Sequence, residues 1–286
     1  MRRAIVLGHT GFLGRALVER LRRDDWHVVG YGSGTLDLRR PEALSMLDGL
    51  ASPDATLFLT AALTPDRGAT LDVLADNLTM TLNMARYLDR HPVDMCVYFS
   101  SDAVYPMDAD PVTETSAVEP AGLYALAKYA GERMLHRAVE TAGLRLLVLR
   151  VTSVYGPGDT HGSYGPNLFV RTVAREKRVR LFGGGEETRD HVYVSDVAAV
   201  AATLAEAGTT GVFNVATGES RTFASIVDEL REIVPFDFVV ESMPRKNAIT
   251  HRRFDVSRVR RALPDFRFTG FEDGLRATWA AARDAA

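Results

Sequence analysis

Short apolar runs alternate with amphipathic segments through the first half of the chain. The runs predict strands over 4–7, 27–31, 55–60, 95–100 and 145–151. Apolar residues at 71, 74, 78, 82, 85 and 88 recur at helical spacing, as do those from 123 to 138. The run from Met95 to Ser100 is apolar on both faces, which is typical of a strand buried in a parallel sheet. The alternation predicts an α/β fold with a doubly wound parallel sheet and ligands at the carboxyl ends of the strands.

A glycine-rich turn, Gly-His-Thr-Gly-Phe-Leu-Gly over 8–14, follows the first predicted strand. Gly8 permits the tight turn, Gly11 leaves room for phosphates, and Gly14 lets the following helix pack close to the strand. A helix that begins there offers unpaired N–H groups to a pyrophosphate. The spacing is G-x-x-G-x-x-G, and a glycine triplet alone is weak evidence. Its place between a strand and a helix predicts a Rossmann-type dinucleotide-binding domain.

The pattern changes after Tyr155, where glycines and prolines interrupt shorter elements. We predict a dinucleotide-binding domain over 1–152. Residues 153–286 are predicted to form mainly a smaller substrate-binding lobe, with some segments that return to the first domain. Within this half, 211–216 has the pattern of a strand, and Thr222 is a candidate cap for the helix that follows it.

Composition changes this picture little. The 286 residues carry a net charge of −3, which gives no reason to expect nucleic acid or an anionic membrane as a partner. The only cysteine, Cys96, lies in an apolar run and has no partner for an internal disulfide. The apolar run after Arg2 and Arg3 is too short for a signal peptide, and no stretch approaches membrane-spanning length. These features predict a cytoplasmic protein.

The histidines 161, 191 and 251 are scattered, and we interpret them as surface or loop residues, with His161 a weak candidate for substrate contact. No metal site is predicted.

Three residues downstream of the glycine turn suggest chemistry at an alcohol. Ser101 ends a buried strand, and Tyr124 and Lys128 lie one helical turn apart. A phenol has a pKa of about 10, but a neighbouring ammonium and a cationic nicotinamide favour its ionised form. A Tyr–Lys pair can also be a solvated surface pair, and a serine can simply cap a strand. Their order after the glycine turn favours proton transfer at an alcohol whose carbon gains or loses hydride.

The chain resembles the extended short-chain dehydrogenases/reductases, the NAD(P)-dependent nucleotide-sugar epimerases, dehydratases and reductases, over essentially its whole length. Besides the glycine turn, the matching stretches are FSSDAVYP, YALAK, LRVTSVYGPG, RDHVYVSDVA and GVFNVATGES. The resemblance implies that Ser101, Tyr124 and Lys128 are the catalytic triad, with Tyr124 as the acid/base. It also implies a homodimer formed through the predicted helices at about 70–90 and 122–142.

The resemblance implies two sets of binding residues. The dinucleotide contacts are Gly8, Thr10, Gly11, Phe12, Leu13, Gly14, Asp37, Leu38, Ala61, Ala62, Asn77, Tyr124 and Lys128. The nucleotide-sugar contacts are Ser101, Asp102, Ala103, Ser153, Asn167, Arg189 and Arg253. A guanidinium fork such as that of Arg189 suits a diphosphate, although without the resemblance Arg189 and Asp190 would be interpreted as a surface ion pair.

Two departures from the family narrow the reaction. Dehydratases and decarboxylases carry an acid two places after the catalytic serine, where this chain has Ala103. Enzymes of the fucose-synthase type use a cysteine there and a later histidine, which here align with Ala103 and Asn167. Two reactions remain. One is the reduction of a 4-keto sugar nucleotide, and the other is C4 epimerisation through a transient ketone with tightly held NAD.

The cofactor decides between them. NAD-binding relatives end the second strand with an acid, where this chain has Gly32. No carboxylate there repels a 2′-phosphate, but no arginine follows until Arg39 and Arg40. The missing acid therefore weakly favours NADP over NAD. For the same reason it favours a 4-ketoreductase over an epimerase. A non-catalytic dinucleotide sensor is a distant alternative, because such proteins usually lose the tyrosine or lysine. Asn167 and Arg189 argue against a substrate that is not a nucleotide sugar.

Overall fold

The computed structural model describes residues 2–245 and 248–284. Its centre is a six-stranded parallel sheet in the order β2-β1-β3-β4-β5-β9. The strands are β1 (Arg3–Leu7), β2 (His27–Tyr31), β3 (Ala55–Leu59), β4 (Met95–Ser101), β5 (Arg145–Val151) and β9 (Gly211–Val215). The predicted doubly wound α/β fold is confirmed, and the strand order reverses at β1, where ligands bind in such sheets.

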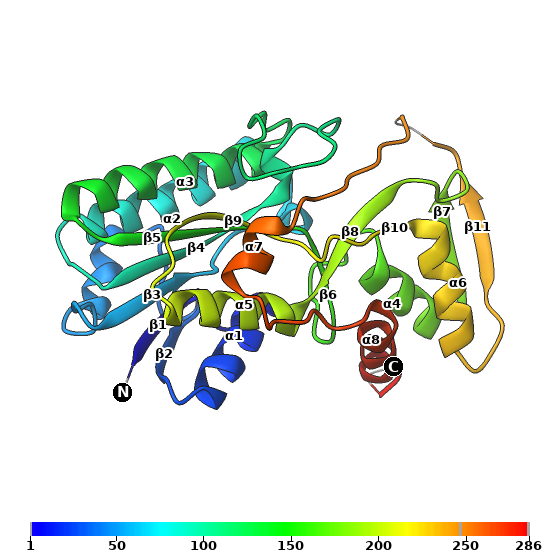
Figure 1. The fold of residues 1–286 in the computed structure, drawn as a ribbon, viewed down its shortest axis with the longest axis horizontal. Coiled ribbons are helices and arrows are strands. Elements are labelled where there is room, and N and C mark those ends of the chain that lie inside the picture. Colours follow the sequence, from blue (N-terminus) through cyan, green and yellow to red (C-terminus); the bar gives the residue numbers. More distant parts are fainter. Residues whose placement is uncertain (1, 246–247, 285–286) are drawn as a thin grey trace.

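Helices cover both faces of this sheet (Figure 1). The helices are α1 (Phe12–Arg23) and α5 (Val194–Glu206) on one face, and α2 (Leu71–Leu88) and α3 (Leu123–Ala142) on the other. Val97 of β4 belongs to the core under α1 and α5, whereas its neighbours Cys96 and Tyr98 belong to the core under α2 and α3. Since successive side chains of a strand point to opposite faces, both faces of β4 are apolar.

Local signals set the helix ends near the sheet. The Thr70 hydroxyl accepts a hydrogen bond from the Val73 N–H (3.3 Å) at the start of α2. Gly143 ends α3 in the left-handed conformation, with a φ of 69°. Both helices begin and end close to the limits that the apolar stripes predict.

A smaller lobe lies beside the sheet and has a core of its own (Figure 1). It holds β6 (Ser153–Tyr155), β8 (Thr188–Tyr193) and β10 (Ser220–Thr222) in one sheet, and β7 (Arg178–Phe182) and β11 (Val239–Met243) in another. Its helices are α4 (Pro166–Glu176), α6 (Phe223–Ile233) and α8 (Phe271–Asp284). The Thr222 hydroxyl accepts from the Ser225 N–H (3.0 Å) and caps α6 as predicted.

Several later segments pack on the first sheet. Strand β9 pairs with β5, α5 packs against α1, and α7 (Ser257–Ala262) contacts β9. Residues 248–256, which lead into α7, cross between the two parts (Figure 1), and Phe254 among them forms a bridge with Val112. Three short 3-10 helices complete the elements: η1 (Pro41–Leu47), η2 (Pro65–Arg67) and η3 (Asp102–Val104). None of the helices in the described ranges is both long and apolar enough to cross a bilayer.

Candidate active site

The glycine turn between β1 and α1 forms a cradle in which Gly8, Gly11 and Gly14 add no side chains. Gly8 has a φ of 96°, and a Cβ there would lie 2.6 Å from the Thr60 hydroxyl oxygen. A Cβ on Gly14 would lie 2.0 Å from the Gly8 carbonyl oxygen. Gly11 caps α1 without a side-chain hydrogen bond, so the first N–H groups of the helix are left for a ligand. This geometry fits the pyrophosphate of a dinucleotide.

The end of β2 carries a glycine, Gly32, and any larger residue there would require the Thr10 side chain to move. A Cβ on Gly32 would lie 2.8 Å from the hydroxyl oxygen of Thr10. The next carboxylate along the chain, Asp37, accepts from the guanidinium of Arg39 (2.8 Å), which lowers the pKa of Asp37. Arg39 is itself shared with Asp76 (2.9 Å). Leu38, predicted to contact the adenine, has its side chain in the core under α2 and α3.

Asn77 shapes the loop after β3. Its side-chain oxygen accepts from the Leu63 N–H (2.8 Å), and its amide donates to the Leu63 carbonyl (2.9 Å). These bonds hold the loop that includes the half-buried Ala61 and Ala62. The structure thus places this loop beside the glycine cradle, since the Ala61 N–H lies within 2.7 Å of a Cβ built on Gly8.

The predicted triad lies where β4 ends and α3 begins. The Ser101 hydroxyl accepts from the Ala103 N–H (3.1 Å), so it caps η3. Lys128 is 5% exposed, donates to the Phe99 carbonyl (2.8 Å), and has its Nζ 5.7 Å from the ring centre of Tyr124. Because Lys128 is this buried, it does not form a solvated surface pair with Tyr124. Helix α3 contacts η3, the segment that directly follows Ser101, and the Asp102 carboxylate of η3 acts on Tyr124.

The electrostatics of the triad differ from the expectation. Burial, together with the Asp102 carboxylate, raises the pKa of Tyr124. Burial lowers the pKa of Lys128 to about 8, although Glu132 opposes this shift. The chain's own groups therefore keep the phenol protonated, and the lowering of its pKa by a cationic nicotinamide stays a prediction. A protonated phenol is ready to donate a proton.

A buried ion pair lies one helical turn beyond Lys128. Glu132 accepts from Nε (2.9 Å) and Nη2 (2.7 Å) of Arg150 and from the Ser100 hydroxyl (2.5 Å). No prediction from the sequence included this ion pair. The available signal was Glu132 itself, which follows Tyr124 and Lys128 at the same helical spacing.

Two arginines converge near Asp102. Arg252 is 3% exposed, donates to the Asp102 carbonyl (2.9 Å), and has a guanidinium nitrogen 3.7 Å from its carboxylate. Arg189 donates to the carbonyl (2.9 Å) and hydroxyl (2.9 Å) of Thr250. Burial and the charge of Arg252 lower the pKa of Arg189. Two partly desolvated guanidinium groups, of which Arg252 pairs with Asp102, form a site suited to a diphosphate.

The side chain of Arg253, a predicted substrate contact, lies on the surface, unlike that of its buried neighbour Arg252. The Arg253 side chain is 70% exposed and bonds to Asp110 (2.6 Å) on the surface. Successive side chains of an extended segment point to opposite sides, so Arg252 faces the site and Arg253 faces solvent.

The other predicted substrate contacts have mixed placements. The buried side chain of Asn167 accepts from the Gly156 N–H (3.0 Å) and donates to the Val154 carbonyl (3.4 Å). Its amide therefore bonds to backbone on both sides. Ser153 is exposed at the start of β6, and Ala103 lies in η3 beside Ser101.

His191 is not a surface residue, which corrects the prediction. It is 4% exposed, and neither ring nitrogen has a hydrogen-bond partner among the described residues. His161 pairs with Asp159 (3.1 Å), and His251 is exposed and bonds to Thr188 (3.2 Å). Within residues 2–245 and 248–284, no cluster of three His, Cys, Asp or Glu side chains could hold a metal ion.

Comparisons with known proteins agree on one family. The model of the "NAD dependent epimerase/dehydratase family" matches residues 4–216. UDP-glucose 4-epimerase of Mycolicibacterium smegmatis is 31% identical over 251 residues, or 76% of this chain and 77% of that protein. The structure of Thermus thermophilus UDP-glucose 4-epimerase with NAD has a TM-score of 0.87, 26% identity, and coverage of 99% of this chain and 100% of that one. The structure of RMD from Pseudomonas aeruginosa with NADPH shares the fold, with a TM-score of 0.90, 24% identity and full coverage of both chains.

Proposed function

Because the chain belongs to the NAD dependent epimerase/dehydratase family, we propose that it reduces the 4-keto group of a nucleotide-activated sugar with NADPH. The observation that carries this proposal is the placement of Asp102. Its carboxylate influences the pKa of Tyr124 on one side and lies near Arg252 on the other. An acid/base for an alcohol and an anion site are thus neighbours, as a sugar diphosphate requires.

The residues of the site have separate tasks in this reaction. When bound, a reduced nicotinamide supplies the hydride that adds to carbon 4. Tyr124, kept protonated by its surroundings, donates its proton to the oxygen of that carbon, which converts the ketone into an alcohol. The Ser101 hydroxyl donates a hydrogen bond to the same oxygen. Lys128 is mostly an ammonium at neutral pH and stabilises the phenolate that remains.

The end of β2 supports NADPH as the reductant. A carboxylate at that place would bind the ribose 2′-hydroxyl of NAD and repel a 2′-phosphate. Gly32 carries no carboxylate, and Asp37, the next acid along the chain, is paired with Arg39, which also pairs with Asp76. A reductase consumes free cofactor at each turnover, for which NADPH is suited.

C4 epimerisation is the second candidate. The Mycolicibacterium smegmatis relative and the Thermus thermophilus structure both carry the name UDP-glucose 4-epimerase, and the latter holds NAD. The same tyrosine would first remove a proton and then return it, while NAD stays bound. Both candidates use one site, so the cofactor separates them.

The first experiment identifies the dinucleotide that the purified protein releases on denaturation. We expect little dinucleotide, tighter binding of NADPH than of NADH, and NADPH oxidation with a UDP-activated 4-keto-6-deoxyhexose. Tyr124→Phe should lower this rate by about 10²- to 10⁴-fold, whereas Tyr129→Phe on the same helix should not. Stoichiometric NAD together with interconversion of UDP-glucose and UDP-galactose would instead establish the epimerase.

We further propose a homodimer formed through α2 and α3. Leu82 of α2 and Leu126 of α3 are exposed apolar residues, although both helices also cover the sheet. Light scattering should give twice the mass of the chain, and Leu82→Glu with Leu126→Glu should give the single mass. A monomeric wild-type protein would contradict this. A cytoplasmic location stays a prediction.

A further inference from the structure

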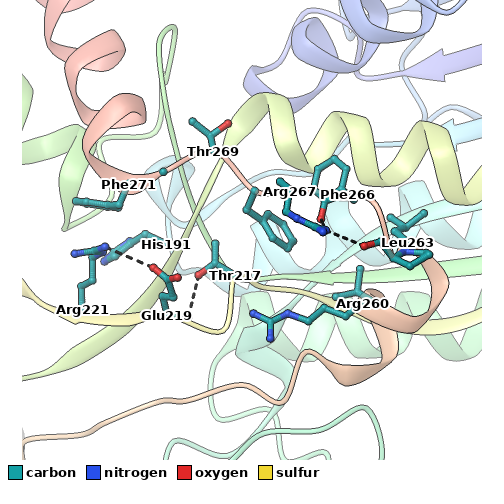
Figure 2. Close-up of a pocket in the computed structure, with 14 residues that line it drawn as sticks. His191, Thr217, Glu219, Arg221, Arg260, Leu263, Phe266, Arg267, Thr269 and Phe271 are labelled. Atoms are coloured by element: carbon teal, nitrogen blue, oxygen red, sulfur yellow. Dashed lines mark hydrogen bonds and ion pairs between the residues drawn. The ribbon is translucent and has the colours of Figure 1, made fainter.

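A cavity separate from the candidate active site lies between α7, the segment that leads to α8, and the loop after β9. Its volume is about 430 Å³, and Thr217, Glu219, Leu263 and Phe271 are among the residues that line it. Figure 2 shows His191 on one side of this cavity, across from Phe266 and Arg260. None of its lining residues belongs to the predicted cofactor or substrate contacts. The volume is within the range of small-molecule sites.

His191 lines the cavity, and its two ring nitrogens are buried. It is 4% exposed, and neither ring nitrogen has a partner in the described part of the chain. The rings of Phe223 and Phe271 lie 6.0 Å from it and offer no hydrogen bond. Buried polar atoms normally have partners, so a bound molecule is expected to supply one once the imidazole turns toward the cavity. Burial lowers the pKa of His191 to about 3, which leaves a neutral ring with one donor and one acceptor.

The cavity also carries excess positive charge. Arg221 is balanced, because it pairs with Glu229 (2.6 Å) and lies 3.6 Å from Glu219. Arg267 bonds only to the carbonyls of Pro264 (2.8 Å) and Phe266 (2.9 Å). Arg260 has no side-chain hydrogen bond or ion pair to any other described residue. Two lining guanidinium groups therefore lack a carboxylate, and they suit an anionic group.

Aromatic rings supply the remaining wall. Phe266 and Phe268 lie 5.1 Å apart edge to face, and Phe271 lies under the guanidinium of Arg221 (4.8 Å). We propose that this cavity binds a small aromatic acid, a planar ring that carries a carboxylate, phosphate or sulfonate. The ring packs on the phenylalanines, the acidic group meets Arg260 and Arg267, and a polar edge hydrogen-bonds to His191. Neither the reaction nor its substrate requires this site.

The test uses the aromatic sulfonate 1-anilinonaphthalene-8-sulfonate as probe. NADPH and UDP are added at saturation so that the probe cannot occupy the predicted active site. We expect saturable binding to one site per chain, measured by probe fluorescence. Arg260→Gln with Arg267→Gln should weaken binding about tenfold, because two charge-assisted contacts are lost. The uncharged N-phenyl-1-naphthylamine should bind the wild type correspondingly more weakly.

Two further comparisons keep the result specific. The matched control Arg22→Gln with Arg23→Gln removes the same charge from exposed positions of α1 and should leave binding unchanged. His191→Phe should weaken binding. The variant also identifies the His191 peak in the ¹H–¹³C spectrum, because that peak is the one it removes. In the wild type this peak should shift when the probe is added. The arginine variants alter only exposed side chains, so they remain informative if His191→Phe does not fold. No saturable binding, or equal affinity in wild type and the Arg260/Arg267 variant, would overturn the proposal.

Discussion

Replacing Glu132 by glutamine should destabilise the protein strongly. The side chains of Glu132 and Arg150 are each 6% exposed and joined by two hydrogen bonds of 2.9 and 2.7 Å. The tyrosine ring of Tyr105 lies 4.8 Å from the guanidinium and cannot replace the lost charge. Breaking a buried pair from one side costs about 3–5 kcal/mol, because the remaining ion stays desolvated and unpaired.

The assay is urea unfolding followed by circular dichroism, with the free energy of unfolding compared between variants. Glu140→Gln on the exposed side of α3 is the matched control and should change stability by less than about 0.5 kcal/mol. Glu132→Met combined with Arg150→Met removes both charges and should recover at least half of the loss. A loss below about 1 kcal/mol for Glu132→Gln would refute the reasoning, since it would mean that the pair is effectively solvated.

Three other outcomes follow from the site. Arg252→Gln should weaken UDP binding in calorimetry by about 1.5–3 kcal/mol, because a charged hydrogen-bond donor is lost, and Arg253→Gln should not; equal effects would refute the assignment. In the pH profile, kcat/KM should fall as pH rises through about 8, where Lys128 loses its proton, and a flat profile to pH 9 would exclude its role. His191 has a folded pKa of about 3, against 6.5 unfolded. Below pH 6.5 only the unfolded state binds this proton, so stability should fall with falling pH, by at most about 1.4 kcal/mol per unit. His191→Phe should flatten this slope, and an unchanged slope would contradict a buried neutral ring.

Local patterns predicted the elements of the first domain well. The apolar stripe predicts α2 between Leu71 and Leu88, and in the smaller lobe Thr222 is predictable as the cap of α6. Such signals depend on residues within one or two turns of each other, so they are readable without knowledge of the fold. The glycine cradle is readable for the same reason, because the positive φ at Gly8 favours glycine wherever the strand lies in the sheet.

Predictions that depended on which way a side chain points were less accurate. An isolated Arg-Arg sequence does not reveal which guanidinium is buried, and only the crossing segment placed Arg252 beside Asp102. The sequence motif also does not show that the amide of Asn167 bonds to the backbone near Gly156. The first contact joins residues 150 positions apart in the chain, and the second depends on how the loop after β6 folds back onto α4.

The sequence by itself determined the doubly wound sheet, the glycine cradle and the candidate Ser101, Tyr124 and Lys128, because each follows from short-range spacing. Only the tertiary structure decided the electrostatics. Burial raised the pKa of Tyr124, lowered that of Lys128 and left His191 without a partner beside a cavity. The cost of removing a charge from water depends on every element packed around it, and no local pattern in the chain records that environment.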